Sequence, residues 1–134
     1  MVAFSQQRFR NSKKQGDAGL GIAIGWFTEQ GYTVCIPLTD SQDYDLVVEI
    51  KPPILSRVQV KTSTYQTPRG SWEVGLRTAG GNRSGIGKIK KLDPKAVDYL
   101  FIVTGDGSRY LIPSAEVCGS SRITLGNKYL YFRV

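Results

Sequence analysis

The chain of 134 residues contains no histidine and only two cysteines, Cys35 and Cys118, which lie far apart. The usual ligands of a zinc site and the usual base of a catalytic triad are therefore absent. The cysteines lack the CxxC spacing and are too few for a disulfide framework, so we expect a reducing compartment such as the cytoplasm. Cys35 belongs to an apolar strand pattern, which predicts a small core residue.

Long apolar runs and acidic residues are also scarce. No run approaches the ~18 residues of a membrane span and no apolar signal segment is present, so we expect no membrane partner. The chain has 11 Asp and Glu against 18 Lys and Arg, which gives a formal net charge of +7. Such a balance favours a polyanionic partner such as nucleic acid, with a merely basic surface as the alternative.

A chain of this length with 40% hydrophobic residues can bury a core, so we expect residues 1–134 to form one domain. The apolar pattern predicts one helix at 17–30, with Asp17 as its N-cap and Gly31 just past its end. Its inward face would carry Leu20, Ala23, Ile24 and Phe27. Glycines cost stability inside a helix, so we expect close packing against a sheet at Gly19, Gly21 and Gly25.

The rest of the chain carries mainly strand patterns, which are β-branched and apolar runs separated by turn residues. They cover residues 33–38, 44–50, 57–62, 72–78, 97–104, 109–113, 122–125 and 128–133. The last two are separated by Gly126-Asn127 and predict a C-terminal β-hairpin. One helix followed mainly by strands predicts an α/β fold with a mixed β-sheet.

Two stretches are basic and poor in core residues, namely an N-terminal arm at 1–15 and a loop rich in glycine and lysine at 79–95. Lysine and arginine that neutralise phosphates give salt-dependent affinity, and glycine permits close backbone approach. We expect DNA contacts from both stretches, with a plain solvated surface as the alternative. The candidate residues, which include one just before the loop, are Lys13, Lys14, Arg77, Arg83, Lys88, Lys90 and Lys91.

The strands at 44–50 and 57–62 carry polar side chains that a plain buried strand does not need. Gln59 and Lys61 are two residues apart and therefore share one face of their strand. Lysine is rarely buried without a partner, and Asp45 on the other strand is the obvious partner. A Lys-Pro-Pro segment breaks the run between the strands, because proline does not fit inside a central strand. A hairpin would bring Asp45 near Gln59 and Lys61.

This trio suits metal-dependent hydrolysis of a phosphodiester bond. Mg²⁺, with Mn²⁺ as a possible substitute, takes oxygen ligands such as carboxylates. Asp45 offers a carboxylate, Gln59 a side-chain oxygen, and Val60 its backbone carbonyl. Lys61 would orient the attacking water or neutralise charge that develops on the phosphate. We therefore predict Asp45, Gln59 and Lys61 as catalytic residues, and Asp45, Gln59 and Val60 as metal ligands.

Asp45 followed after thirteen residues by Gln59-Val60-Lys61 resembles the core of the PD-(D/E)XK nuclease superfamily, in its variant with Gln at the second acidic position. With Gly16-Asp17, Gly31-Tyr32 and Pro37-Leu38-Thr39, the ordered set is similar to the group I intron-associated homing endonucleases of that superfamily. The similarity covers roughly residues 12–113.

The resemblance implies a restriction-endonuclease-like fold, in which helices flank a mixed β-sheet. It also implies Mg²⁺-dependent, sequence-specific cleavage of double-stranded DNA. A long two-fold target would call for a homo-oligomer, either a dimer or a tetramer.

One position departs from the family pattern. Many superfamily members carry a metal-binding glutamate on the first helix, and the matching position here is Leu20. Asp17 or Glu49 would be the substitute carboxylates. The departure leaves two alternatives open: a catalytically inactive DNA-binding relative, or a nuclease specific for junctions or repair substrates.

Overall fold

The computed structural model describes residues 12–79, 89–117 and 119–134, with the side chains of residues 78, 79, 89 and 90 left aside. Residues 1–11 of the expected basic arm, and Arg83 and Lys88 of the expected loop, lie outside the described residues. So does Cys118. Within the described ranges, no helix is both long enough and apolar enough to cross a membrane.

The chain forms one long helix, α1 (Ser12–Glu29), and a five-stranded mixed sheet in the order β1-β2-β3-β7-β8. The strands of this sheet are β1 (Val34–Cys35), β2 (Leu46–Lys51), β3 (Ile54–Ser63), β7 (Tyr99–Thr104) and β8 (Arg109–Pro113). Two smaller ribbons pair β4 (Trp72–Gly75) with β9 (Arg122–Leu125), and β5 (Thr78–Ala79) with β6 (Ile89–Lys90). Short 3₁₀ helices are η2 (Ser114–Val117) and η3 (Asn127–Phe132).

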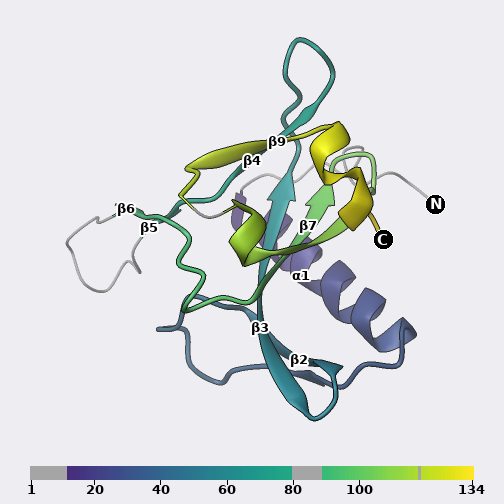
Figure 1. Ribbon diagram of the computed structural model, residues 1–134, viewed down its shortest axis with the longest axis vertical. Coiled ribbons are helices and arrows are strands. Elements are labelled where there is room, and N and C mark those ends of the chain that lie inside the picture. The colour runs from purple at the N-terminus through teal and green to yellow at the C-terminus, as the bar shows by residue number, and fades with distance from the viewer. Residues whose placement is uncertain (1–11, 80–88, 118) are drawn as a thin grey trace.

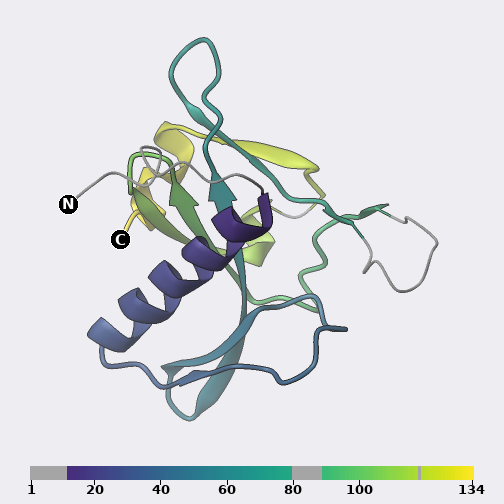
Figure 2. The same ribbon diagram turned by 180° about the vertical axis from the view of Figure 1, so that it is seen from behind.

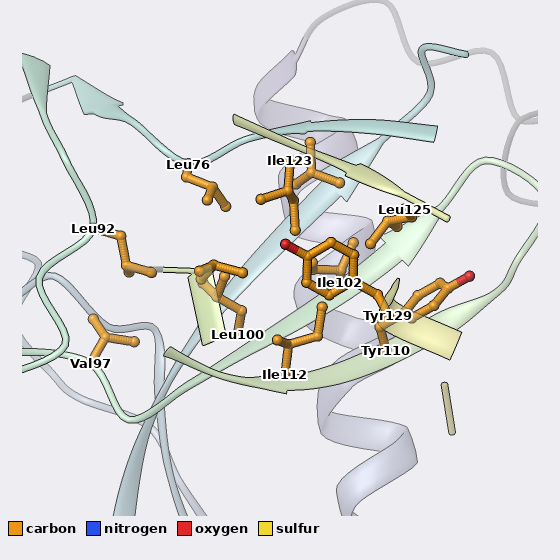
Figure 3. Close-up of a cluster of buried hydrophobic side chains, with 12 residues drawn as sticks. Leu76, Leu92, Val97, Leu100, Ile102, Tyr110, Ile112, Ile123, Leu125 and Tyr129 are labelled. Atoms are coloured by element: carbon orange, nitrogen blue, oxygen red, sulfur yellow. The ribbon is translucent and has the colours of Figure 1, made fainter. Parts of the chain in front are cut away.

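Helix α1 covers one face of the five-stranded sheet, and the β4–β9 ribbon lies over the other (Figures 1 and 2). Strand β7 serves both faces, because its side chains alternate. Phe101 and Val103 join the core beneath α1. Leu100 and Ile102 join a second core, shown in Figure 3, on the side of β4 and β9. A central strand buried on both faces needs the near-continuous apolar run that the sequence shows.

The hairpin expected around the Lys-Pro-Pro break is confirmed. β2 and β3 pair antiparallel with Leu46 opposite Val58, and the Pro52–Pro53 bond at the turn is cis. β3 then pairs parallel with β7, from Val58 opposite Tyr99 to Ser63 opposite Thr104. The strand that carries Gln59 and Lys61 is therefore the middle strand of the sheet.

The predicted end of the helix is confirmed, but its predicted start is wrong. Gly31 has φ +84, its N–H bonds to Thr28 O at 3.0 Å, and the N–H of Tyr32 bonds to Phe27 O at 3.1 Å. This left-handed closing turn favours glycine. The described helix already begins at Ser12, so Asp17 lies inside it rather than at its N-cap. The first turns carry few apolar residues, so periodicity gave no sign of them.

Two other expectations are corrected. Cys35 is exposed, because β1 is an edge strand whose Val34 packs toward α1 while Cys35 points the other way. The C-terminal β-hairpin is also wrong: β9 pairs with β4 instead, and residues 127–132 form η3. Tyr129 and Phe132 both contact the core, and their spacing of three residues matches a 3₁₀ helix rather than a strand.

Arg57 and Asp98 join β3 and β7 just before the first pair of their parallel register, a contact that the sequence did not reveal. The Arg57 guanidinium donates to both Asp98 carboxylate oxygens at 3.0 and 3.1 Å, and the Arg57 backbone N–H donates to the same carboxylate at 2.7 Å. The hydrogen bonds from Arg57 hold the pKa of Asp98 below its ordinary 3.8. The resulting stabilisation is therefore present above pH 3.8 and is lost as the pH falls through the lowered value.

We predict that Gly19→Ala destabilises the protein while Gly21→Ala does not. A Cβ on Gly19 would overlap Cγ2 of Thr62 on β3, whereas a Cβ on Gly21 would meet nothing within 4 Å. Overpacking of this kind costs about 1–3 kcal/mol, and alanine in an open helical position gains up to about 1 kcal/mol. Urea denaturation of the two variants measures the difference, and equal free energies of unfolding would contradict the close approach.

Candidate active site

Asp45 lies where β2 separates from β3. Its backbone N–H still bonds to Val58 O at 2.9 Å, and its carboxylate Oδ2 accepts a hydrogen bond from the Val60 N–H at 2.7 Å. The Asp45 side chain thus supplies the hydrogen-bond acceptor that a neighbouring strand would otherwise offer to the Val60 N–H. This bond fixes the Asp45 carboxylate at Val60, which lies between Gln59 and Lys61 in the sequence.

The side chains of β3 alternate around this point. Val60 and Thr62 face α1, since both lie against Gly19 and Thr62 Oγ1 accepts a hydrogen bond from Gln15 at 3.0 Å. Gln59 and Lys61 therefore share the opposite face of the strand. The hairpin brings Asp45 alongside the segment of β3 that carries Gln59 and Lys61, with its carboxylate bonded to the Val60 N–H.

Gln59 is the unusual member of this group. Only 5% of the residue is exposed, and its Oε1 has no hydrogen-bond partner among the residues that the structure describes. A buried acceptor without a partner costs about 1–3 kcal/mol, so such an atom calls for an explanation. An oxygen of this kind is available to a cation or to a water molecule.

An open cleft of about 410 Å³ lies between α1 and Asp45. It is lined by Lys13, Gly16, Asp17, Leu20, Asp45 and Val60. Leu20 thus faces the same space as Asp45, at the helix position where the resemblance expects a carboxylate. Of the two possible substitutes, Asp17 lines this cleft and Glu49 does not.

The charges at the site are partly stripped of water. Desolvation raises the pKa of Asp45 above its ordinary 3.8, against the opposing effects of the Val60 N–H bond and the Lys61 charge. Desolvation likewise lowers the pKa of Lys61 below 10.5, against the attraction of Asp45. The two groups act on each other through space rather than through a direct ion pair. Each carries its charge less readily than it would in water, and perturbed pairs of this kind are typical of functional sites.

The donor set near Asp45 suits a hard cation bound by few carboxylates. Within the described part of the chain, no group of three or more His, Cys, Asp or Glu side chains is placed to hold a metal ion. The oxygens of the predicted ligands are the Asp45 carboxylate, Gln59 Oε1 and the Val60 carbonyl, and the Asp17 carboxylate lines the same cleft as Asp45. Oxygen donors of these types are the ligands that Mg²⁺ accepts, often completed by waters and substrate phosphate.

The expected DNA-contacting residues lie in different places. Lys13 lines the cleft beside Asp45, and Lys14 is exposed on α1. Lys91 is exposed just after β6, and the backbone of Lys90 belongs to β6. Arg77 is exposed on the far side of the sheet from α1. It lines a second cleft, of about 440 Å³, together with Glu73, Gly75, Ser121 and Arg122.

Sequence reasoning missed Gly16 and Arg122 as parts of these clefts. Gly16 lies in the helical turns before Asp17, which lack an apolar stripe. Arg122 ion-pairs with Glu73 at 3.1 Å, a contact that follows from the pairing of β4 with β9. No local sequence signal indicates that pairing, because Arg122 lies 47 positions after Gly75 (122 − 75), its partner in the register.

The helix over a mixed sheet and the central hairpin agree with the nuclease family that the sequence motif resembles. The sequence model of the PD-(D/E)XK endonuclease family matches residues 10–128. The chain belongs to this family, which confirms the resemblance drawn from the motif. A comparison with curated proteins finds no significant match.

Among solved structures, the chain is similar to that of a bacterial homing endonuclease, I-Ssp6803I. The match has a TM-score of 0.77 and 25% sequence identity, and it covers 92% of this chain and 88% of that chain. The likeness confirms the restriction-endonuclease-like fold. Nucleases of this family generally use divalent metal ions.

We predict that Asp45→Asn stabilises the protein at neutral pH. A carboxyl whose pKa is raised by folding contributes stability below its ordinary 3.8, and this contribution is lost as the pH rises through the raised value. Asparagine avoids that loss and can still accept the Val60 N–H bond. Asp45→Ala leaves this N–H without its partner and should be less stable than Asp45→Asn by about 1 kcal/mol.

Urea denaturation between pH 3 and pH 8 compares the wild type with both variants. The free energy of unfolding of the wild type should fall relative to that of Asp45→Asn as the pH rises. A constant difference across this range would show that Asp45 titrates as it does in the unfolded chain.

Proposed function

We propose that the protein is a divalent-metal-dependent endonuclease that hydrolyses phosphodiester bonds in double-stranded DNA. The observation that carries the proposal is the Asp45 carboxylate held by the Val60 N–H, where its charge is close enough to Lys61 to oppose the lowering of the lysine pKa. A net charge of +7 favours a polyanionic substrate. Membership of the PD-(D/E)XK endonuclease family supports the reaction type.

Each residue of the group has a distinct role in this proposal. Asp45, Gln59 Oε1 and the Val60 carbonyl would hold Mg²⁺, which when bound supplies Lewis-acid stabilisation of the phosphate oxygens. Mn²⁺ would be a substitute. Lys61 donates a hydrogen bond to the attacking water or to a phosphate oxygen, where negative charge develops. Because burial lowers the pKa of Lys61, its ammonium gives up a proton more readily than that of an exposed lysine.

The finer proposal is a sequence-specific homing endonuclease. It is supported by the likeness to a bacterial homing endonuclease over 92% of this chain. A two-fold symmetric oligomer, a dimer or a tetramer, would match a long two-fold target. Finding the reading frame inside a group I intron would support this proposal, and a location outside any mobile element would count against it.

A second candidate is a catalytically inactive DNA-binding relative. Leu20 favours it, since this leucine lines the cleft where the family pattern has a carboxylate. The two candidates differ in one observable. The first cleaves DNA when a divalent metal is added, whereas the second binds DNA in a salt-dependent way and never cleaves it.

Lys61→Met should reduce the cleavage rate at least about 100-fold and leave binding largely unchanged. Methionine keeps the size and the apolar stem of lysine but removes the charge that stabilises the transition state. Cleavage of supercoiled plasmid with Mg²⁺, Mn²⁺ or chelator measures activity, and fluorescence anisotropy with labelled duplex in chelator measures binding. Lys51→Met, on an exposed lysine at the β2–β3 turn, is the matched control. Full activity of Lys61→Met would remove the lysine from the chemistry.

Leu20→Glu should tighten Mg²⁺ binding by roughly tenfold, because it adds a carboxylate to a cleft already lined by Asp17 and Asp45. Leu20→Gln has the same length without the charge and serves as the control. Calorimetric titration with Mg²⁺ measures the affinity without any dependence on activity. Equal affinities for both variants would place the metal site away from this cleft.

A further inference from the structure

The hairpin formed by residues 64–71 has no role in the site described above. β3 ends at Ser63 and β4 begins at Trp72, and the segment between them projects beyond every other described element at the top of Figures 1 and 2. It lies at the opposite end of β3 from the β2–β3 turn. The projecting hairpin therefore extends the strand that carries Gln59 and Lys61.

The tip of this hairpin is a hydrogen-bonded turn. The Thr67 N–H bonds to Ser71 O and the Gly70 N–H bonds to Thr67 O, both at 2.8 Å, and the Ser71 N–H bonds to Thr67 Oγ1 at 3.3 Å. Gly70 has φ +85, a conformation that favours glycine. Pro68 and Arg69 are thus fixed as the two central residues of the turn.

The stem of the hairpin is held as well. The Glu73 N–H bonds to Tyr65 O at 3.0 Å, Gln66 pairs with Trp72 in an isolated bridge, and Gln66 Nε2 donates to Gly70 O at 3.1 Å. Internal hydrogen bonds of this kind restrict the conformations of an exposed segment before any partner binds. A partner that binds the hairpin then pays little of the usual ordering cost.

The chemistry of the tip fits an anionic partner. Residues 63–72 contain no Asp or Glu. Arg69 is exposed at the tip and has no hydrogen-bond or ion-pair partner among the described residues. Tyr65 is 60% exposed on the stem. Arginine presents a planar fork of donors that matches the paired acceptors of a guanine edge.

We propose that the 64–71 hairpin enters the major groove of the substrate DNA and that Arg69 reads a base there. A two-stranded ribbon is an element that this groove admits. From Lys61 to Thr67 an extended chain spans about 20 Å, so the base pair would lie within about six base pairs of the cleaved bond. The inference rests on the proposed function for its choice of partner, and it names the part of the chain that supplies sequence preference.

The test uses the full chain and a duplex library with a randomised segment, because the target is not known. Duplexes retained by the protein in chelator are sequenced, so the readout does not depend on cleavage. The wild type should enrich a defined base pair. Arg69→Ala and Arg69→Lys should each weaken that preference by about 5- to 150-fold and leave the other enriched positions intact.

The lysine variant separates base reading from simple charge. If Arg69 reads a base, both variants should lose the base preference and keep the salt slope of the wild type, because that slope reports phosphate contacts; a role as a phosphate contact would instead lower the slope by about one in Arg69→Ala only. Lys51→Ala removes a cation at the β2–β3 turn, at the other end of β3. It should change neither the base preference nor the salt slope. Circular dichroism and unfolding curves that match the wild type would show that each variant folds.

Two results would overturn the inference: wild-type binding without sequence preference, or an Arg69→Lys variant that enriches the same base as strongly as the wild type. A failure of the proposed cleavage activity is recognised separately, by intact plasmid after incubation with Mg²⁺ or Mn²⁺. The binding selection still tests the hairpin in that case.

Discussion

The bond from the Val60 N–H to the Asp45 carboxylate marks the point where β2 leaves β3, and the site depends on it. A backbone N–H in the middle strand of a sheet needs an acceptor once its neighbouring strand ends. Asp45 supplies that acceptor and is thereby fixed against the strand that carries Gln59 and Lys61. The carboxylate that accepts the free N–H of the sheet is also the carboxylate that would hold a cation.

The same arrangement explains why the site is costly to keep. Burial in the fold removes water from Asp45 and Lys61, so both charges are harder to maintain than in solution. The buried Gln59 oxygen adds a further cost, since no described residue donates a hydrogen bond to it. Buried polar and charged groups that lower stability in this way are typical of functional sites. A cation at the oxygens and a phosphate at the lysine would relieve all three at once.

Much of the fold and the spacing of the motif could be predicted from the sequence. The continuous apolar run of β7, the break at the two prolines and the glycine after α1 each have a local physical cause, and each prediction was confirmed. The failures have a common origin in contacts between distant residues. Cys35 has an apolar neighbourhood in sequence but lies on an edge strand, and residues 127–132 have strand-like composition but pack as a 3₁₀ helix.

The sequence by itself determined which chemistry is available, because it contains no histidine and spaces Asp45, Gln59 and Lys61 for a hairpin. Residue type and alternation are local properties that need no fold. Only the tertiary structure decided that Leu20 and Asp17 share a cleft with Asp45, that Arg57 locks onto Asp98, and that the 64–71 hairpin projects from the body. Each of these relations depends on tertiary packing: α1 lies on the sheet beside Asp45, β3 pairs with β7 next to Arg57 and Asp98, and β4 lies outside the five-stranded sheet and pairs with β9.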